Sequence, residues 1–169
     1  QKSSRELIEK ESEYRSLTER LTTGIIRCTP EGKYLFMNNA AKHMLKAYLR
    51  AGLKENINGL TPEEIYTNNE LIGRVNNTVN LISQTGQSIT SRTKYGDRYV
   101  SVNTSPERNE QGEIVSILSI LTDESELMQN IIHLEETERF NSHVVDSSHV
   151  VVYIYDLKNS NQIFANKAL

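Results

Sequence analysis

Residues 88–122 read SITSRTKYGDRYVSVNTSPERNEQGEIVSILSILT, and this stretch decides the fold. Three runs rich in β-branched and apolar residues alternate with two turn signals, Gly96-Asp97 and the longer Asn-Glu-Gln-Gly at 109–112. Such turns join neighbouring antiparallel strands, and the third run, as the most apolar, is predicted to be central in the sheet. The three predicted strands span residues 88–95, 98–105 and 114–122.

Two more strands are predicted upstream, over residues 24–28 and 34–37. The turn between them, Thr-Pro-Glu-Gly at 29–32, places a proline and a glycine where each favours a reversal of the chain. The pair Asn38-Asn39 follows the second strand, and asparagine is a preferred N-cap, so a helix is predicted over residues 40–49.

Further helices are predicted on both sides of the three-strand stretch. Residues 61–64, Thr-Pro-Glu-Glu, combine an N-cap, a first-turn proline and a capping-box glutamate. A longer helix over residues 69–84 carries apolar residues on one face, at Leu71, Val75, Val79 and Ile82. Asp123 and Glu126 have capping-box spacing and begin an exit helix that reaches about residue 141. This order predicts an α+β domain with one antiparallel sheet.

Residues 1–22 are predicted to form an N-terminal amphipathic or coiled-coil helix. Its heptad positions are occupied by Leu7, Tyr14, Leu17 and Leu21. Lys10 interrupts the apolar seam, and the span covers only about three heptads. Two interpretations stay open: the helix pairs with a second copy to form a homodimer, or it lies on its own domain.

Residues 139–169 repeat the pattern of residues 13–41. Val151-Val152 align with Ile25-Ile26, and the segment around Asn166 aligns with the segment around Asn38. A repeat of this length indicates tandem domains rather than a solenoid. We therefore predict that residues 144–169 begin a second domain, truncated here, and we expect the parent chain to continue. The predicted boundaries are 1–22, 23–123, 124–143 for a connector helix, and 144–169.

The segment from about Tyr14 to Ser125 resembles a PAS sensor domain, or sensory box. The motifs that carry the resemblance are Phe36-Met37-Asn38-Asn39-Ala40-Ala41, Thr61-Pro62-Glu63-Glu64-Ile65, the Gly96-Asp97 hairpin, and Gln111-Gly112 before residues 114–121. Residues 121–125 look like the family's closing Asp-Ile-Thr triplet, with Glu124 in place of the apolar residue and Ser125 in place of threonine. The resemblance implies a five-stranded antiparallel sheet with flanking helices.

The same resemblance implies a function in signal transduction. Such domains belong to bacterial multidomain proteins, of which the sensor histidine kinase is the expected type here, and they sense a small ligand or relay conformational change. We expect the joint at Asp123 and Ser125 to convert strand motion into helix motion, without catalysis by this fragment. The alternative is a ligand-free dimerisation module upstream of a cyclic-dinucleotide or transcription-regulator output domain.

A ligand cavity, if the domain has one, is expected between the sheet and the long helix. The predicted apolar wall residues are Ile26, Phe36, Val75, Val79 and Leu118, and they fit either a small apolar ligand or plain core packing. Asn76 and Asn80 lie on the long helix, where family members contact ligands, and the competing interpretation is that both amides face solvent.

Composition excludes several other classes. The net charge is -3 with both signs interspersed, which argues against a nucleic-acid partner. No apolar run reaches the length of a membrane span, so a cytoplasmic domain without membrane contact is expected, although a membrane anchor elsewhere in the parent is compatible. The single cysteine, Cys28, permits no internal disulfide and no cysteine-rich metal site.

No cofactor is identified from the sequence. Cys28 lies on a predicted strand, not in the helix motif of flavin photosensors, and is expected to be a small core residue. His43 has lysines on either side, which favours a surface histidine over a haem ligand. His133 lacks the basic residue and proline of a phosphoacceptor motif, so it is predicted to lie on a solvated face.

Overall fold

The structure, a computed structural model, describes residues 16–53, 56–147 and 150–166. The chain divides into two compact units, one ending at Ser125 and the other beginning at Glu126. Of the residues predicted for the N-terminal helix, Leu7 and Tyr14 lie outside the described residues.

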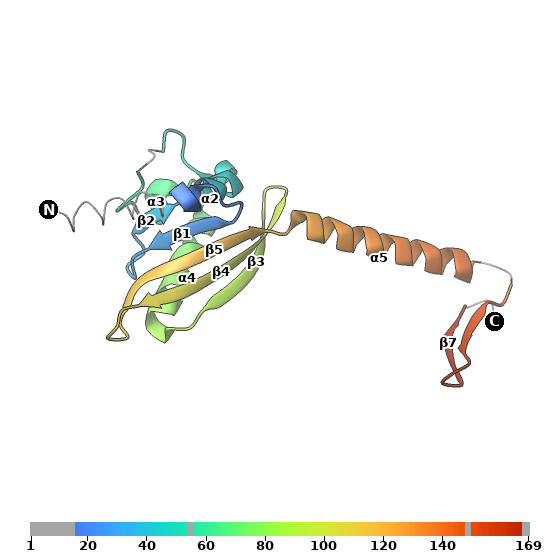
Figure 1. Ribbon diagram of the computed structural model, residues 1–169. Helices are drawn as coiled ribbons and strands as arrows, with labels where there is room; N and C mark the ends of the chain where they lie inside the picture. The colour runs from blue at the N-terminus through green and yellow to red at the C-terminus, as the bar shows by residue number, and fades with distance from the viewer. Residues whose placement is uncertain (1–15, 54–55, 148–149, 167–169) are drawn as a thin grey trace. The chain divides into compact units, whose positions relative to one another are not determined.

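The first unit is built on a five-stranded sheet with the order β2-β1-β5-β4-β3, in which every neighbouring pair is antiparallel (Figure 1). The strands are β1 (Gly24–Cys28), β2 (Tyr34–Met37), β3 (Ile89–Tyr95), β4 (Arg98–Arg108) and β5 (Ile114–Asp123). The apolar β5 is central, as predicted, and the predicted α+β fold with a five-stranded antiparallel sheet is confirmed.

The strand β4 is longer than predicted. It was predicted to end at residue 105, but it continues through Pro106 to Arg108. Pairing between β3 and β4 ends at Ile89 and Thr104, whereas β4 stays paired to β5 as far as Arg108. Pro106 therefore lies where β4 is an edge strand, and there proline's missing N–H is tolerated. At the other end, the tight hairpin predicted at Gly96-Asp97 is present, with Gly96 at a φ of +63°.

The helices of the first unit follow the predicted caps. They are α2 (Asn39–Met44), the 3-10 helix η1 (Lys46–Tyr48), α3 (Pro62–Ile65) and α4 (Asn69–Thr85). The single helix predicted over residues 40–49 is thus two shorter ones, divided at Leu45, which is buried among the core residues. The capping box at Thr61 and Glu64 is confirmed, and α4 ends at Gly86, whose φ of +65° is the left-handed conformation that favours glycine.

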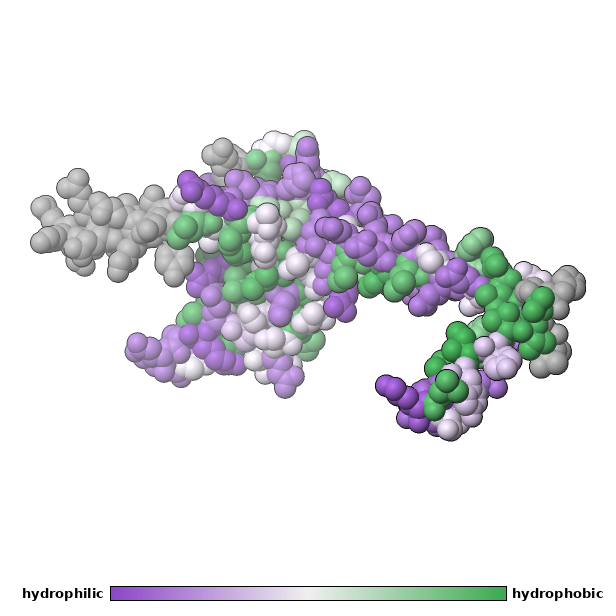
Figure 2. Space-filling model, turned by 45° about the vertical axis from the view of Figure 1, so that its right-hand side comes forward, coloured by the Kyte–Doolittle hydropathy of each residue, from purple (hydrophilic) through white to green (hydrophobic). Residues whose placement is uncertain are grey.

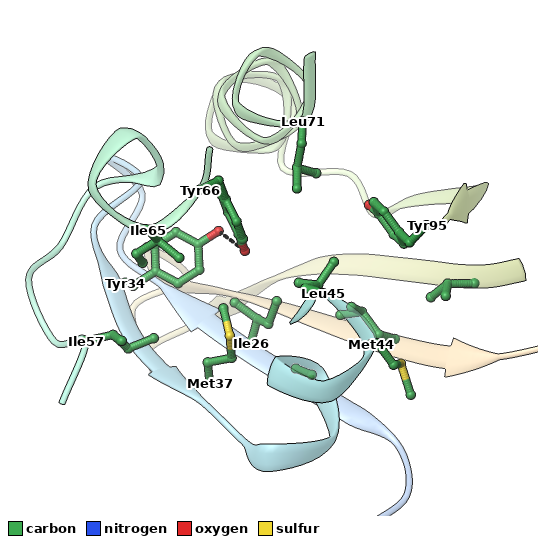
Figure 3. Close-up of a cluster of buried hydrophobic side chains, with 13 residues drawn as sticks. Ile26, Tyr34, Met37, Met44, Leu45, Ile57, Ile65, Tyr66, Leu71 and Tyr95 are labelled. Atoms are coloured by element: carbon green, nitrogen blue, oxygen red, sulfur yellow. Dashed lines mark hydrogen bonds between the residues drawn. The ribbon is translucent and has the colours of Figure 1, made fainter. Parts of the chain in front are cut away.

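One face of the sheet and the helices enclose the core. Figure 3 shows its largest cluster, in which side chains from the sheet meet those of α2, α3 and α4. The fully buried members include Ala41, Ile65 and Tyr66. A second buried group, at the C-terminal half of α4, joins Val79 and Ile82 to Cys28 and Ile117 of the sheet.

The N-terminal helix ends earlier than predicted. The described part is helical over residues 16–19 and turns at Arg20, so Leu21 lies beyond the helix. Asn38 explains this end: its side-chain amide donates hydrogen bonds to the carbonyls of Thr18 and Thr23, each at 2.9 Å. The Thr18 carbonyl also accepts from the Leu21 N–H at 3.4 Å, so the amide adds a second bond at the end of the helix.

Asn38 also accepts two hydrogen bonds, and it is completely buried. Its Oδ1 receives the backbone N–H of Ile25 at 2.8 Å and that of Ala41 at 3.0 Å. One side chain therefore joins the entering segment, β1 and the N-terminus of α2.

The second unit contains most of α5 (Ser125–Asp146) and a two-stranded hairpin of β6 (Tyr153–Asp156) and β7 (Asn161–Ala165). Asn166 repeats the contacts of Asn38. Its Oδ1 accepts from the N–H of Val152 at 2.9 Å, and its Nδ2 donates to the carbonyls of Val145 and Val150 at 2.8 and 2.9 Å. The last turn of α5 is thus held as the N-terminal helix is held.

These bonds correct the alignment of the repeat by one residue. Val152 occupies the position of Ile25, so that the equivalent residue is 127 further along, and Val151 does not align with Ile25 as predicted. The hydrogen bond to the asparagine defines this register, whereas two neighbouring valines do not distinguish one register from the next.

The hairpin of the second unit exposes most of its apolar side chains. Figure 2 shows this unit with extensive hydrophobic surface. The exposed apolar residues are Val150, Val151, Val152, Tyr153, Ile154, Tyr155, Leu157 and Ile163. An isolated two-stranded hairpin buries too little apolar surface to be stable alone in water.

None of the helices that the structure describes is both long and apolar enough to cross a bilayer.

Candidate functional site

A cavity of about 270 Å³ lies in the first unit, between α4 and the inner face of the sheet. Its volume is slightly below the ~300–1,000 Å³ typical of ligand pockets, and it suits a small molecule. The residues around it come from every strand of the sheet, from α4, from the junction of α2 and η1, and from the C-terminal end of α3. They are Ile26, Cys28, Tyr34, Leu45, Tyr66, Leu71, Arg74, Val75, Asn77, Thr78, Val79, Ile89, Ser91, Tyr95, Val102, Thr104, Ser119 and Leu121.

Three of the seven predicted pocket residues line this cavity, namely Ile26, Val75 and Val79. Asn76 does not: it is turned toward α3, and its Nδ2 donates to Glu63 Oε1 at 2.8 Å. Asn80 is exposed and is not among the lining residues. The amide that does line the cavity is Asn77, between the two predicted positions.

Phe36 and Leu118 lie on the other face of the sheet, contrary to the prediction that they point inward. Both pair directly with Arg27, whose side chain is on the outer face, and directly paired residues share a face. The inner positions of β5 are Ile117, Ser119 and Leu121. Ser119 therefore lines the cavity, and not its neighbour Leu118, which was predicted for its hydrophobicity. Alternation along the strand, not side-chain hydrophobicity, decides which residue faces the cavity.

Arg74 was missed by sequence analysis, because a charged residue on a surface helix is normally assigned to solvent. It follows Leu71 by three residues and precedes Thr78 by four, and that spacing places all three on one helix face. Its Nη1 donates to Thr93 Oγ1 at 2.8 Å, and its guanidinium carbon lies 5.8 Å from the centre of the Tyr95 ring. That is within cation–π range.

Three tyrosines surround the same cavity. The Tyr34 hydroxyl donates to the Tyr66 hydroxyl at 2.9 Å, and the two rings meet edge to face (Figure 3). Burial raises the pKa of Tyr34 well above its ordinary value, with a further increase from Tyr66 beside it. Burial likewise raises the pKa of Tyr95, while the positive charge of Arg74 lowers it. Burial raises the pKa of Tyr66 as well, so all three hydroxyls around the cavity are neutral near neutral pH.

Cys28 faces the cavity as a buried, uncharged thiol. Burial raises its pKa to about 11, so the thiolate needed for nucleophilic attack is not formed near neutral pH. Arg74 is the charged member of the lining set, and no carboxylate accompanies it there. The lining therefore combines apolar side chains with hydroxyl, amide and guanidinium groups.

The second functional feature is the joint between the sheet and α5, which we define as residues 123–125 with their partners in the β3–β4 hairpin. Asp123 pairs with Arg98, with Oδ2 and Nη1 2.6 Å apart, and Tyr99 N–H donates to Ser125 Oγ at 3.0 Å. Glu124 N–H donates to the Tyr99 carbonyl at 2.8 Å. The first residue of α5 is thus attached to the start of β4 by side-chain and backbone bonds.

The capping interaction at this joint differs from the predicted one. Asp123 Oδ1 accepts hydrogen bonds from the backbone and hydroxyl of Ser125, at 3.0 and 2.5 Å, instead of pairing with Glu126 in a capping box. The reason is that β5 extends through Asp123, so α5 begins at Ser125 rather than one residue earlier. Burial raises the pKa of Asp123, but the hydrogen bonds from Ser125 and Arg98 outweigh it and leave the pKa below its ordinary value.

Within the described ranges, no group of three or more His, Cys, Asp or Glu side chains is arranged to hold a metal ion.

The fold is similar to those of solved sensor domains. The PAS domain of Bordetella pertussis BvgS shares 19% sequence identity, with a TM-score of 0.54, over 76% of this chain and 98% of that one. VqmA of Vibrio cholerae, a dimer described among LuxR-type receptors, shares 20% identity with a TM-score of 0.52. That match covers 66% of this chain but only 50% of the VqmA chain. A further VqmA structure, bound to DPO, matches with the same identity and TM-score.

The sequence itself gives a direct assignment. No curated protein matches it. Residues 18–129 match the family described as PAS fold, and this span includes the whole five-stranded sheet, the cavity and the joint. With more than half of the chain matched, and with the expected sheet present, the chain belongs to the PAS family.

Proposed function

We propose that residues 23–123 form a sensory and relay module that binds a small molecule in its cavity and transmits the binding event to α5. The observation that carries this proposal is the short distance along β5 from cavity to joint. Leu121 lines the cavity, and Asp123, two residues later, holds the start of α5. A change of packing at the cavity has a short covalent path to the helix.

A second path supports the same proposal. Tyr95 lines the cavity from the end of β3, and Arg98 begins β4 across the tight hairpin. Arg98 in turn pairs with Asp123. The β3–β4 hairpin therefore connects the cavity to the joint, in addition to β5. Relay requires that the ligand bind two conformations with different affinity, so that occupancy shifts the population between them.

In this proposal the module works in the cytoplasm, within a sensor histidine kinase. The kinase assignment rests on the family resemblance of the sequence.

Native mass spectrometry of the purified chain tests the sensory function. We expect a charge-state series shifted by the mass of one small molecule, lost when the cavity is filled by Val79→Trp. Leu81→Trp, on the exposed side of the same helix, is the matched control and should retain the molecule. A chain that carries no molecule, and gains none when incubated with small metabolites, would instead be a ligand-free interaction module.

We further propose that the N-terminal helix pairs two copies of the chain. In the described part Leu17 and Leu21 are 58% and 48% exposed, which leaves apolar surface available for a partner. Since Leu21 lies beyond the helical residues, the proposed seam depends on Leu17 together with Leu7 and Tyr14.

Size-exclusion chromatography with light scattering tests the pairing. At concentrations on the order of tens of micromolar we expect a dimer, and Leu17→Glu should convert it to a monomer because a charge at a seam position opposes pairing. Leu81→Glu changes an equally exposed leucine on α4 and should leave the dimer intact. A wild-type chain that is already monomeric at this concentration contradicts the proposal.

We also propose that residues 144–169 begin a second PAS domain, with residues 124–143 as the connector. The support is the repeated hydrogen bonding of Asn38 and Asn166, together with the exposed apolar hairpin, which a complete domain would bury. In this arrangement α5 leaves one domain and enters the next.

A further inference from the structure

We propose that the cavity binds a small monocarboxylate, with Arg74 holding the carboxylate and the apolar wall around Val79 holding the hydrocarbon body. This inference rests on the proposed sensory function and names the chemical class of its ligand. It replaces the wholly apolar ligand expected from the sequence.

Arg74 has no anionic partner among the described residues. The three ion pairs there involve Arg27, Arg92 and Arg98. Glu70, one helical turn earlier and suited by spacing to pair with Arg74, does not do so. The contacts of the guanidinium are instead the Thr93 hydroxyl and the face of the Tyr95 ring, which orient it without neutralising it.

The guanidinium is therefore a charged, oriented group with donors to spare. It carries five N–H donors in a planar fork, of which one is used by Thr93. That fork matches the two oxygens of a carboxylate, and such bidentate pairs are the strongest hydrogen bonds that arginine forms. A partly enclosed cavity strengthens the interaction, because fewer waters compete for the charge.

The rest of the cavity suits a short hydrocarbon body. Val79 is five residues beyond Arg74 on α4, a displacement of about 7.5 Å along the helix at 1.5 Å per residue. Around Val79 the wall is made by Cys28, Val75 and Ile89. A chain of about six carbons spans this distance, and it would pass the hydroxyls of Thr104 and Ser119, which bond to each other at 3.0 Å.

A phosphate ester fits this site less well. Phosphate carries up to two negative charges, and its sites in proteins usually combine several donors from a helix N-terminus or a cluster of basic residues. Here one arginine is the cationic group in the lining, and it projects from the middle of α4 rather than from its N-terminus. One positive charge beside an apolar wall matches one carboxylate on an apolar body.

The test compares two probes that differ only in the charged group, sodium hexanoate and hexan-1-ol, titrated calorimetrically into the 169-residue chain at neutral pH. We expect hexanoate to bind at least about tenfold more tightly than the alcohol, the ratio expected for a charge-assisted hydrogen-bonded pair. Arg74→Gln should reduce this ratio to near one, and Arg74→Lys should retain part of it. Arg20→Gln removes the same charge outside the cavity and should leave the ratio unchanged.

The ratio of the two affinities can be compared even where a variant is less stable. A smaller folded fraction lowers the apparent affinity for hexanoate and for hexan-1-ol by the same factor. Equal binding of the two probes to the wild-type chain, a ratio that persists in Arg74→Gln, or no binding of either probe would each overturn the carboxylate inference. The sensory proposal is judged separately. It survives if hexan-1-ol binds to wild type but not to Val79→Trp, or if native mass spectrometry finds a neutral molecule that Arg74→Gln retains.

Discussion

Replacing Asn38 with alanine is expected to lower the free energy of unfolding of the first unit by about 3–5 kcal/mol. The side chain is fully buried and makes four hydrogen bonds to backbone groups of three segments. Alanine leaves the N–H of Ile25 and the carbonyls of Thr18 and Thr23 without these partners. Thermal and urea unfolding followed by circular dichroism measure the loss, which should lower the midpoint temperature by more than about 10 °C.

Asn166→Ala is the matched control for this change. It removes three corresponding hydrogen bonds from the second unit, where the asparagine is also buried but most of the apolar residues around the hairpin are exposed. The main unfolding transition should therefore stay where it is in wild type. Asn38→Asp separates the two halves of the interaction, since a carboxylate still accepts from Ile25 but cannot donate to Thr18. A loss below about 1 kcal/mol for Asn38→Ala would contradict the role given to this residue.

The strands and caps of this domain are predictable from sequence because their signals are local. Gly96-Asp97 sets the β3–β4 hairpin, and Thr61 with Glu64 forms the predicted capping box. The pair Asn38-Asn39 was predicted to cap the next helix, and the structure assigns this to Asn38, whose Oδ1 accepts from Ala41 N–H. Its two further bonds, to Thr18 and Thr23, depend on the path of the entering chain and leave no local pattern.

The cavity was predicted only in part, because its lining breaks the rule that apolar residues face inward. Ser119 faces the cavity while Leu118 faces the outer side of the sheet, and hydrophobicity alone reverses that pair. Arg74 is hidden from sequence analysis for the same reason. Its contacts, the Thr93 hydroxyl and the Tyr95 ring, come from β3, which follows α4 in the chain, and they leave no local pattern in the helix.

Replacing Asp123 with alanine is expected to speed hydrogen exchange of the first-turn amides of α5 by about ten- to a hundredfold, without comparable change in the sheet. The carboxylate holds Ser125 through two hydrogen bonds and pairs with Arg98, so its loss frees the helix start from the β3–β4 hairpin. Hydrogen exchange resolved by mass spectrometry measures the effect. In a sensor the same variant should weaken the response of α5 to ligand.

The neighbouring ion pair supplies the control. Arg92 pairs with Glu124 at 3.0 Å, but the Arg92 side chain is 75% exposed, and pairs of that kind contribute little. Arg92→Ala should therefore leave the exchange of the helix start almost unchanged. The pH dependence has a definite sign: because the folded pKa of Asp123 is depressed, its contribution is complete above the ordinary aspartate pKa of ~3.9 and is lost as pH falls through the folded value. If Arg92→Ala and Asp123→Ala accelerated exchange equally, the joint would depend on general surface charge, and the specific link from cavity to helix through Asp123 would be wrong.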